Sequence, residues 1–466
     1  MGGFFLAQVC LPVVQTKDFG KPGYNFGNYL YEAPDVQDLV AGTLYFHAAV
    51  IKENAKTGIM IWSKTSNLGS EDSFESLCVN KQGEITTCDI LKEVKRSYNL
   101  TQNLRENLAI VAASPADGPI SMPGKFYTDF QLFAWECDTV LQTGWHCLGR
   151  SDEIPNDGDY FTQQVLNEPL LITRADGTIK VLSNACRHRG MPVAQGAGNA
   201  RRHVCPYHAW AYGPDGQLLS APRMKNTGFD LKTCALPAFV SRVHNGFIYA
   251  SLSDSPDIFD LADLDGLIAP YEPENFRHIH TANEVWNCNW KALVENFMEG
   301  YHLSVVHPET LHHYTPTGLS RKGPSGAGFT SYFANYPDSA AGRGTGAAGL
   351  TEDERKRSTL FAVYPSQVVS VAATTMVSLS IFPLSLEQIE VRWTFSTYGD
   401  ELDDGLLADR IAVWDEVNRE DREKLEKMQK ALHSRHATGG PLASADYEGT
   451  VRDFQRWIAK RSAELA

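Results

Sequence analysis

Two short stretches of this sequence each place a cysteine beside a histidine. The first reads Cys186-x-His188 and the second Cys205-x-x-His208. Two thiolates and two imidazoles can complete the tetrahedral shell of a structural zinc ion. The same groups can hold a [2Fe–2S] cluster, with both thiolates on one iron and both imidazoles on the other. The cluster is favoured because each stretch supplies one ligand of each kind, whereas zinc ligands usually come as a cysteine pair followed by a histidine pair.

The residues around these pairs suit a cluster. Gly190, Gly196 and Gly198, which lie between the pairs, predict tight turns whose backbone approaches the cluster sulfides closely. Trp210 and Tyr212 are expected to shield the site from water. The second ring nitrogen of His208 is expected to donate a hydrogen bond outward, as metal-bound imidazoles usually do.

A second group of candidate ligands lies in the segment 289–313. Helical spacing predicts that Glu295, Glu299 and His302 lie within one or two turns of each other. The five-residue step from His302 to His307 predicts that the helix bends or ends between them. Two histidines with one carboxylate form the facial triad that binds Fe(II) and leaves positions open for dioxygen and substrate. The alternative is a pair of histidines that only pack in the core.

The carboxylate of such a triad is predicted from a helix near the C-terminus. Apolar residues repeat there at steps of three and four: Ile411, Trp414, Val417, Leu425, Met428 and Leu432. Asp421 falls on this stripe and is expected to face the core. A buried carboxylate needs a metal, or a lysine or arginine, as its partner. Asp409 and Asp415 fall off the stripe and are expected in solvent, so Asp421 is the candidate ligand.

Both groups resemble one family. The stretches CRHRG and CPYHAWAYGPDGQL resemble the Rieske signature. NWKALVENFMEGYHLSVVH, together with the helical run 418–429, resembles the catalytic domain of Rieske non-haem iron oxygenase α subunits, and the similarity covers roughly residues 120–466. The resemblance implies that the two Cys-His pairs bind a [2Fe–2S] cluster through Cys186, His188, Cys205 and His208. It also implies that a mononuclear Fe(II) is bound by the triad of His302, His307 and Asp421.

The resemblance also implies the architecture. The fold class is α+β, with an all-β Rieske domain over 143–255 inserted into a helix-grip catalytic domain made of 119–142 and 256–466. Residues 1–118 form an N-terminal region of unknown role, in which strands are predicted over 43–51 and 58–63 and a helix over 89–113. Further on, the sequence predicts short strands over 145–252, an unpatterned loop over 318–349, strands over 360–398 and a helix over 404–432.

In this family subunits usually form head-to-tail trimers. The resemblance implies that Glu299 bridges His302 to His208 of the neighbouring chain and so carries electrons between the two metal centres. Most members have aspartate at this position, and the glutamate resembles carnitine and glycine betaine monooxygenases. The expected function is that of a terminal oxygenase, a mono- or dioxygenase that hydroxylates a small organic substrate with O2. Electrons would come from NAD(P)H through a reductase or ferredoxin.

The substrate is expected to be a quaternary ammonium or an aromatic compound. An ammonium group would favour an aromatic cage, and an acid group would favour an arginine such as Arg321 or Arg343. Most aromatic residues near the site are nevertheless expected to pack in the core, namely Phe297, Tyr301, Tyr314, Phe329 and Tyr332. Two other classes stay open at this point, a Rieske electron carrier without the iron triad and a zinc-bearing binding protein.

Composition narrows the setting. The 466 residues carry a formal net charge of -14, which disfavours nucleic acid as a partner. No apolar run approaches the roughly 18 residues that a membrane helix needs. Nine cysteines in an irregular pattern predict reduced thiols and a cytoplasmic location. Against the acidic background, five basic residues near the cluster are expected either to dock an acidic reductase or to form an ordinary solvated face: Arg187, Arg189, Arg201, Arg202 and His203.

Overall fold

The computed structural model describes residues 49–51, 59–62, 77–79, 85–87, 102–115, 118–225, 227–340, 342–399 and 403–464. Residues 105–129 and 136–466 form one compact unit. The described part of the N-terminal unit contains a four-stranded antiparallel sheet. Its strands are β1 (Ala49–Ile51), β2 (Ile59–Trp62), β3 (Leu77–Val79) and β4 (Ile85–Thr87).

Both strands predicted at the N-terminus are present in the described residues, as β1 and β2, and the rest of their predicted ranges, 43–48, 58 and 63, lies outside the described residues. The C-terminal part of the helix predicted over 89–113 is present as α2 (Gln102–Ala112), and residues 89–101 of that prediction lie outside the described residues. Arg456 Nε donates to the carbonyl of Ala112 over 3.1 Å, which ties the end of α2 to the C-terminal helix. Among the described residues, no helix is both long enough and apolar enough to cross a membrane.

The region that carries the Cys-His pairs is all-β, as the sequence predicted. Its strands form three sheets, ordered β8-β7-β6-β9, β13-β14-β5 and β10-β11-β12. The strands are β5 (His146–Arg150), β6 (Asp159–Val165), β7 (Glu168–Ala175), β8 (Thr178–Ser183), β9 (Ala197–Asn199), β10 (His203–Val204), β11 (Ala211–Tyr212), β12 (Leu218–Ser220), β13 (Val240–His244) and β14 (Phe247–Ser251). A separate apolar cluster, which includes Leu171, Trp210 and Leu236, lies beneath both cysteines.

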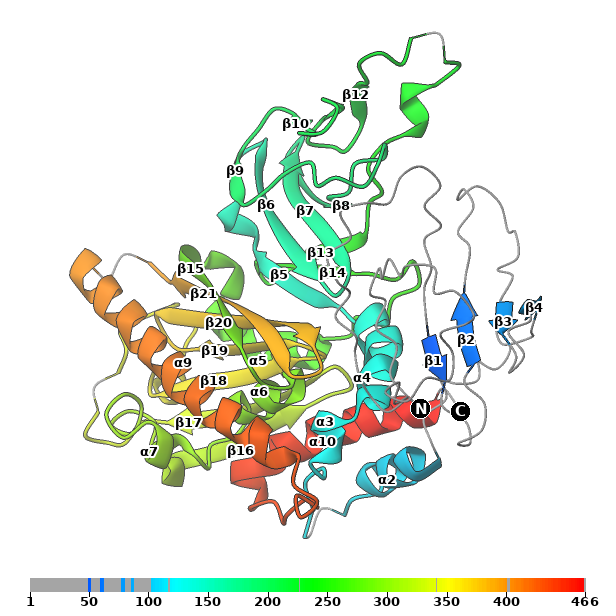
Figure 1. Cartoon of the computed structure of the whole chain (residues 1–466). Helices are drawn as coiled ribbons and strands as arrows, with labels where there is room; N and C mark the ends of the chain where they lie inside the picture. Colours follow the sequence, from blue (N-terminus) through cyan, green and yellow to red (C-terminus); the bar gives the residue numbers. More distant parts are fainter. Residues whose placement is uncertain are drawn as a thin grey trace. The chain divides into compact units, whose positions relative to one another are not determined.

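A seven-stranded antiparallel sheet forms the centre of the C-terminal region, with the order β15-β21-β20-β19-β18-β17-β16 (Figure 1). The strands are β15 (Arg277–Trp286), β16 (Ser320–Ser325), β17 (Phe329–Asn335), β18 (Arg357–Val363), β19 (Gln367–Val371), β20 (Thr375–Ser385) and β21 (Gln388–Thr397). The central strands β18 and β19 are buried along almost their whole length, which explains their continuous apolar and small residues.

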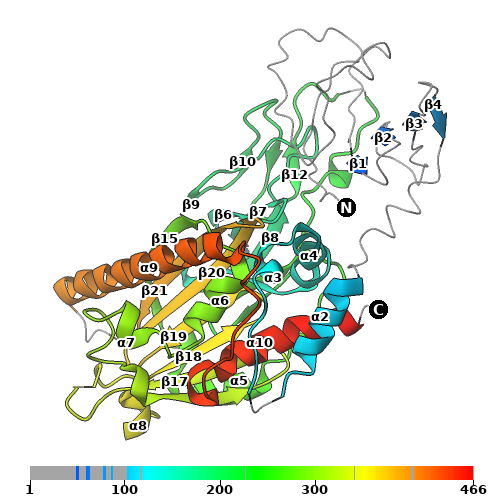
Figure 2. The same cartoon turned by 60° about the horizontal axis from the view of Figure 1, so that its bottom comes forward.

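Three helices lie along this sheet (Figure 2). The helix α6 (Trp290–Phe297) contacts β19 and β20, α9 (Asp404–Leu432) contacts α6 and β15, and α10 (Ala445–Glu464) contacts β16 and β17. The α+β class and the predicted long C-terminal helix are therefore confirmed. The metal-ligand candidates come from α9 and from the chain that follows α6.

One predicted loop is wrong. The segment 318–349 contains β16 and β17, which pair from Ser320 with Ala334 to Ser325 with Thr330. Glycine, serine and alanine conceal these strands in the sequence, but β17 places Phe329 and Tyr332 in the core, where they are 1% and 2% exposed. Pairing with β18 supplies the hydrogen bonds that local propensity does not predict.

The segment 119–129 belongs with the C-terminal region rather than with the strands that follow it. Gly124 N donates to the carbonyl of Ala437 over 2.7 Å, and the side chain of Asn289 donates to the carbonyl of Tyr127 over 3.4 Å. These contacts join the segment 119–129 to the part of the chain that follows the Rieske region.

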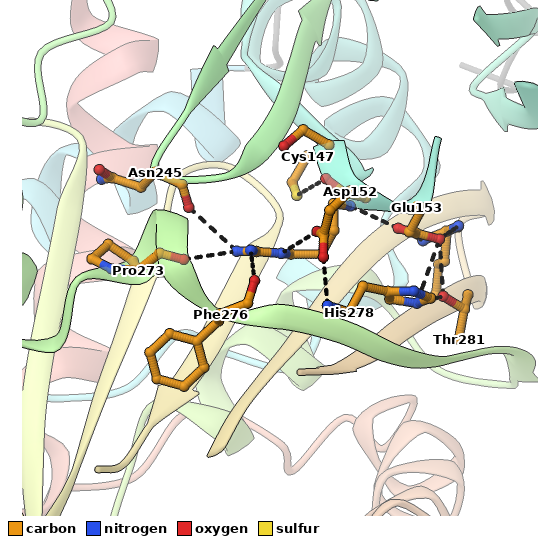
Figure 3. A network of polar contacts seen from close by, with 12 residues as sticks. Cys147, Asp152, Glu153, Asn245, Pro273, Phe276, His278 and Thr281 are labelled. Carbon is orange, nitrogen blue, oxygen red and sulfur yellow. Dashed lines mark hydrogen bonds and ion pairs between the residues drawn. The ribbon is translucent and has the colours of Figure 1, made fainter. Parts of the chain in front are cut away.

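A buried arginine ties the Rieske region to the segment that leads into β15. Arg150, 1% exposed, donates to the carbonyls of Pro273 and Phe276 over 3.1 and 2.6 Å, and its Nε donates to Asp152 over 3.2 Å. The other oxygen of Asp152 accepts from the backbone N–H of His278 over 2.5 Å (Figure 3). This network replaces the water that these carbonyls would otherwise bind, so it fixes the Rieske region against the sheet that carries the second site.

The neighbouring Glu153 makes a second connection. Its carboxylate pairs with Arg392 of β21 over 2.5 Å and accepts from Thr281 over 2.9 Å (Figure 3). Burial raises the pKa of Glu153, but the facing guanidinium of Arg392 outweighs this effect, so the pKa lies below its ordinary value. The pair is therefore charged at neutral pH.

Candidate iron–sulfur and mononuclear metal sites

Two tight turns present the Cys-His pairs. In the first, Gly190 N donates to the carbonyl of Cys186 over 2.8 Å; in the second, Ala209 N donates to the carbonyl of Cys205 over 3.0 Å. Gly190 and Ala209 both have positive φ, +76° and +57°, so each turn closes through the same left-handed conformation. Short-range hydrogen bonds thus position each cysteine, with its histidine two or three residues further along.

The four predicted cluster ligands converge with the sulfurs inside and the imidazoles outside. Cys186 and Cys205 are 3% and 2% exposed, whereas His188 and His208 are exposed with their ring centroids 4.6 Å apart. Trp210 is buried and stacks on His188 at 5.0 Å, as the predicted shielding requires. Buried thiols beside outward imidazoles fit a [2Fe–2S] cluster with its histidine-bound iron at the surface.

Tyr212 completes the first turn. Its hydroxyl oxygen lies 3.3 Å from the Sγ of Cys186 and accepts from the backbone N–H of Arg187 over 3.0 Å. Burial, followed by the hydrogen bond with Cys186, raises the pKa of Tyr212 above its ordinary value. The phenol is therefore neutral and can donate to a cluster-bound thiolate.

The basic residues near the cluster are only partly as expected. Four are exposed and form what we call the arginine patch: Arg187, Arg189, Arg201 and Arg202. His203 is 3% exposed and lies edge-on to the ring of Tyr160 at 4.9 Å. It is excluded from the patch because β10 turns its side chain inward.

The second site begins where α6 ends. Helix α6 stops at Phe297, and a one-turn helix, α7 (Leu303–Val306), follows. His302 and His307 are the capping residues at the two ends of α7. The five-residue spacing therefore brackets a single turn, which brings the two rings to 5.1 Å.

His302, His307 and Asp421 come together as the sequence predicted. Their ligand atoms all lie within 4.8 Å of one another. Asp421 Oδ1 is 3.1 Å from His307 Nε2 and 3.6 Å from His302 Nε2. Two of these atoms, His307 Nε2 and Asp421 Oδ1, are buried and have no hydrogen-bond partner within the described part of the chain. Because buried polar atoms are rarely left unpaired, the set fits a metal ion that all three would share.

Electrostatics agree with a charged ligand set. Burial raises the pKa of Asp421, but the facing imidazoles of His307 and His302 lower it below its ordinary value. Asp409 and Asp415 are exposed, as predicted. Met428, predicted on the buried stripe, is 41% exposed. The next residue, Gln429, is buried instead, and its side-chain oxygen accepts from the backbone N–H of Asn289 over 3.0 Å.

Glu299 and Glu295, which the sequence placed together, contact different partners. Glu299 Oε1 accepts from His302 Nδ1 over 2.5 Å and Oε2 accepts from the backbone N–H of His302 over 3.1 Å. Glu295 instead faces away, accepting from the Tyr127 hydroxyl over 2.7 Å and from the Gln455 side chain over 3.1 Å. The chain leaves the helix after Phe297, which is why helical spacing misplaced Glu295.

Sequence reasoning missed Glu420. Its carboxylate accepts from His307 Nδ1 and from the Thr310 hydroxyl, each over 2.7 Å. The signal in the sequence is its place in the run 418–429 that carries the family resemblance, directly before Asp421. Adjacent helical positions point about 100° apart, so the stripe that identifies Asp421 gives no reason to choose its neighbour.

The aromatic residues and arginines considered as substrate-binding candidates differ in their exposure and contacts. Phe297, Phe329 and Tyr332 are buried, as expected, and Tyr301 is 57% exposed. The guanidinium of Arg343 lies over the rings of Tyr314 and Tyr336, at 4.8 and 5.4 Å. Arg321 is exposed and donates to the carbonyls of residues 318 and 320.

Comparison with known proteins matches both regions of the chain to domains of one family. Residues 144–239 match the Rieske [2Fe-2S] domain, and residues 273–464 match the ring hydroxylating alpha subunit (catalytic domain). Together the two matches cover more than half of the chain and contain all of the predicted ligands. The chain belongs to the Rieske non-haem iron oxygenase α subunits.

Relatives of this oxygenase include the glycine betaine monooxygenase oxygenase subunits of two bacteria. That of Chromohalobacter salexigens is 38% identical over 221 residues, 45% of this chain and half of the relative. That of Pseudomonas aeruginosa (strain UCBPP-PA14) is 27% identical over 385 residues, 74% of this chain and 90% of the relative. The fold matches the quaternary ammonium Rieske monooxygenase CntA with a TM-score of 0.66 at 23% identity, covering 76% of this chain and 98% of CntA.

Proposed function

We propose that this terminal oxygenase hydroxylates a small quaternary ammonium compound, such as a betaine or a carnitine. The observation that carries the proposal is Glu299, a glutamate held against His302 Nδ1 at the position where most of the family has aspartate. The glycine betaine monooxygenase subunits among the relatives support the same substrate class.

We propose the ligands as follows. Cys186, His188, Cys205 and His208 hold the [2Fe–2S] cluster, and His302, His307 and Asp421 hold Fe(II). When bound, the cluster supplies single electrons and the Fe(II) supplies the activation of O2. The protein's own part is to bind both groups, orient the substrate and exclude water.

We propose that Glu299 contacts two histidines, His302 of its own chain and His208 of a neighbouring copy. Its carboxylate fixes the Nδ1 hydrogen of His302, so that Nε2 carries the lone pair that faces Asp421. The exposed ring of His208 is free to donate outward, and we propose that it reaches Glu299 of a neighbouring copy in a head-to-tail trimer. The side chain of Glu299 is 13% exposed, which leaves part of the carboxylate accessible.

We propose that the arginine patch docks an acidic reductase or ferredoxin, which draws on NAD(P)H in the cytoplasm. All four guanidiniums are exposed beside the cluster in a chain of net charge -14. Such a local charge reversal speeds association with an acidic partner at low salt.

Metal analysis separates the competing classes. An oxygenase should hold about three irons per chain, two with acid-labile sulfide and one without. Two irons, both with sulfide, would indicate an electron carrier, and colourless protein with zinc would indicate a binding protein.

Turnover tests the substrate. Oxygen uptake with a surrogate reductase should be stimulated by glycine betaine or carnitine and not by small aromatic acids. Glu299→Gln should keep both metals, because the amide oxygen still accepts from His302, and should largely lose turnover. Full coupled turnover in that variant would refute the bridge, and uptake with aromatic acids alone would refute the substrate class. Glu423→Gln, an exposed change on α9, is the control.

A further inference from the structure

Both ring nitrogens of His307 face one helix. Nε2 lies 3.1 Å from Asp421, and Nδ1 lies 2.7 Å from Glu420 Oε2. These carboxylates belong to consecutive residues of α9, and Glu420 is 113 residues from His307 in the chain. The imidazole is completely buried, so its orientation is set by these two contacts and the packing around it.

Glu420 differs from the other glutamates on the same part of α9. Glu416 and Glu423 are 45% and 44% exposed and pair with Arg419 and Lys427 along the helix surface. The side chain of Glu420 is 14% exposed, and within the described part of the chain it forms no ion pair with lysine or arginine. Glu420 is therefore less exposed than the solvated glutamates of this helix and lacks their ion pairs with lysine or arginine.

A hydroxyl holds the Glu420 carboxylate in place. Thr310, three residues beyond His307, donates to the same Oε2 over 2.7 Å. The contact closes a ring that runs from α9 to the chain after α7 and back through the imidazole. Because that oxygen already has two donors, the carboxylate has little freedom to leave His307.

The consequence lies in the tautomer of the imidazole. A carboxylate at Nδ1 keeps the proton on that nitrogen, which leaves the lone pair on Nε2, a buried atom with no hydrogen-bond partner among the described residues. A carboxylate on the far nitrogen also makes an imidazole a stronger metal ligand.

We propose that Glu420 is a positioning residue of the mononuclear site, which holds His307 with Nε2 directed at the metal and thereby sets metal affinity. The proposal rests on the proposed function, since it takes His307 as an iron ligand. It separates two glutamates that make similar contacts: Glu420 serves metal binding within the subunit, whereas Glu299 serves communication with a neighbour.

The test measures metal binding apart from turnover. The mononuclear site of the cluster-loaded protein is emptied with a chelator and titrated with Co(II), whose visible bands report coordination. Glu420→Ala should weaken Co(II) binding by about 10- to 100-fold, the usual effect of removing such a partner. Glu420→Gln, whose amide oxygen still accepts from Nδ1, should recover most of the affinity with shifted Co(II) bands. Glu423→Gln should match wild type.

Comparison with Glu299→Gln completes the design. Glu420→Gln should keep most of its turnover after loading with Fe(II), whereas Glu299→Gln should keep the metal and lose turnover. Wild-type affinity and unchanged Co(II) bands in Glu420→Ala would overturn the proposal. If the alanine variant fails to retain its cluster absorbance, Thr310→Val provides the second test. This variant should lose less Co(II) affinity than Glu420→Ala, and an affinity equal to wild type would refute the proposal. A wild-type protein that binds no Co(II) would instead overturn the proposed function.

Discussion

The buried carboxyl of Glu295 gives this protein a stability that should fall as pH rises. Burial is the largest cause, and it raises the pKa of Glu295 from 4.5 to about 7, while the hydrogen bonds from Tyr127 and Gln455 lower it only in part. In the unfolded chain the same carboxyl ionises near its ordinary value. Folding therefore takes up a proton between these two pKa values, and stability decreases with pH across that window.

The size of the effect follows from the shift. Each pKa unit corresponds to 1.36 kcal/mol, so a shift from 4.5 to about 7 gives about 3 kcal/mol at pH 8 and above. Below pH 4.5 the contribution to stability is complete, and it is lost as the pH passes 7. Glu295→Gln mimics the protonated acid and has no titration of its own. It should match wild type near pH 4.5 and be more stable by up to about 3 kcal/mol at pH 8 to 9.

Chemical unfolding at a series of pH values from 4.5 to 9 measures this difference. Tryptophan fluorescence follows unfolding of both regions, because Trp210 of the Rieske region is buried as well as Trp290 and Trp393 of the C-terminal region. Visible absorbance of the cluster follows the Rieske region alone. Glu423→Gln, an exposed change, should leave the pH dependence unaltered. If Glu295→Gln and wild type run parallel across the whole range, Glu295 is ionised in the folded state and the reasoning is wrong.

Three further outcomes are expected. Lys291 and Glu136 form an ion pair that is 0% exposed on both sides, at 2.7 Å. Lys291→Met should therefore destabilise the protein by about 3–5 kcal/mol, and adding Glu136→Leu should recover part of the loss in denaturant unfolding; equal or additive losses would contradict the pairing. The lowered pKa of Glu153 means that its stabilising charge is present above the ordinary glutamate pKa and is lost as pH falls through the lowered value. Glu153→Gln should flatten the acid side of the stability profile. Arg392→Met should be less stable than wild type at neutral pH, and the difference should shrink as pH falls through the lowered pKa of Glu153. An unchanged acid side in Glu153→Gln would show that this ion pair does not cause the acid dependence. Finally, with reductase limiting, turnover should fall steeply between low and moderate salt, and replacing the arginine patch by glutamines should remove that dependence, whereas a flat response in wild type would remove the docking site.

The Cys-His pairs were readable because their geometry is local. Each cysteine is followed within three residues by its histidine, and a backbone hydrogen bond within the same turn orients both. A short segment with a tight turn has few conformations, so the order of ligands along the chain nearly fixes their arrangement. The α+β class and the long C-terminal helix were readable for a related reason, since a repeating apolar stripe reports which side of an element is buried.

Asp421 was an intermediate case. The stripe on α9 showed that it faces the core, but only the folded chain shows that His302 and His307 meet it there. The helix period places a residue on a face and says nothing of what lies opposite.

What the tertiary structure alone decided are contacts between segments far apart in the chain. The sequence placed Glu420 in a family-like run but gave it no role, put Glu295 beside the wrong partners and concealed β16 and β17 in a stretch of small residues. In each case the deciding interaction comes from another element: His307 for Glu420, Tyr127 for Glu295, and β18 for β17. Local propensity cannot predict these contacts. The hydrogen bonds between distant segments, and the exclusion of water around them, form only when the sheet and its helices pack together.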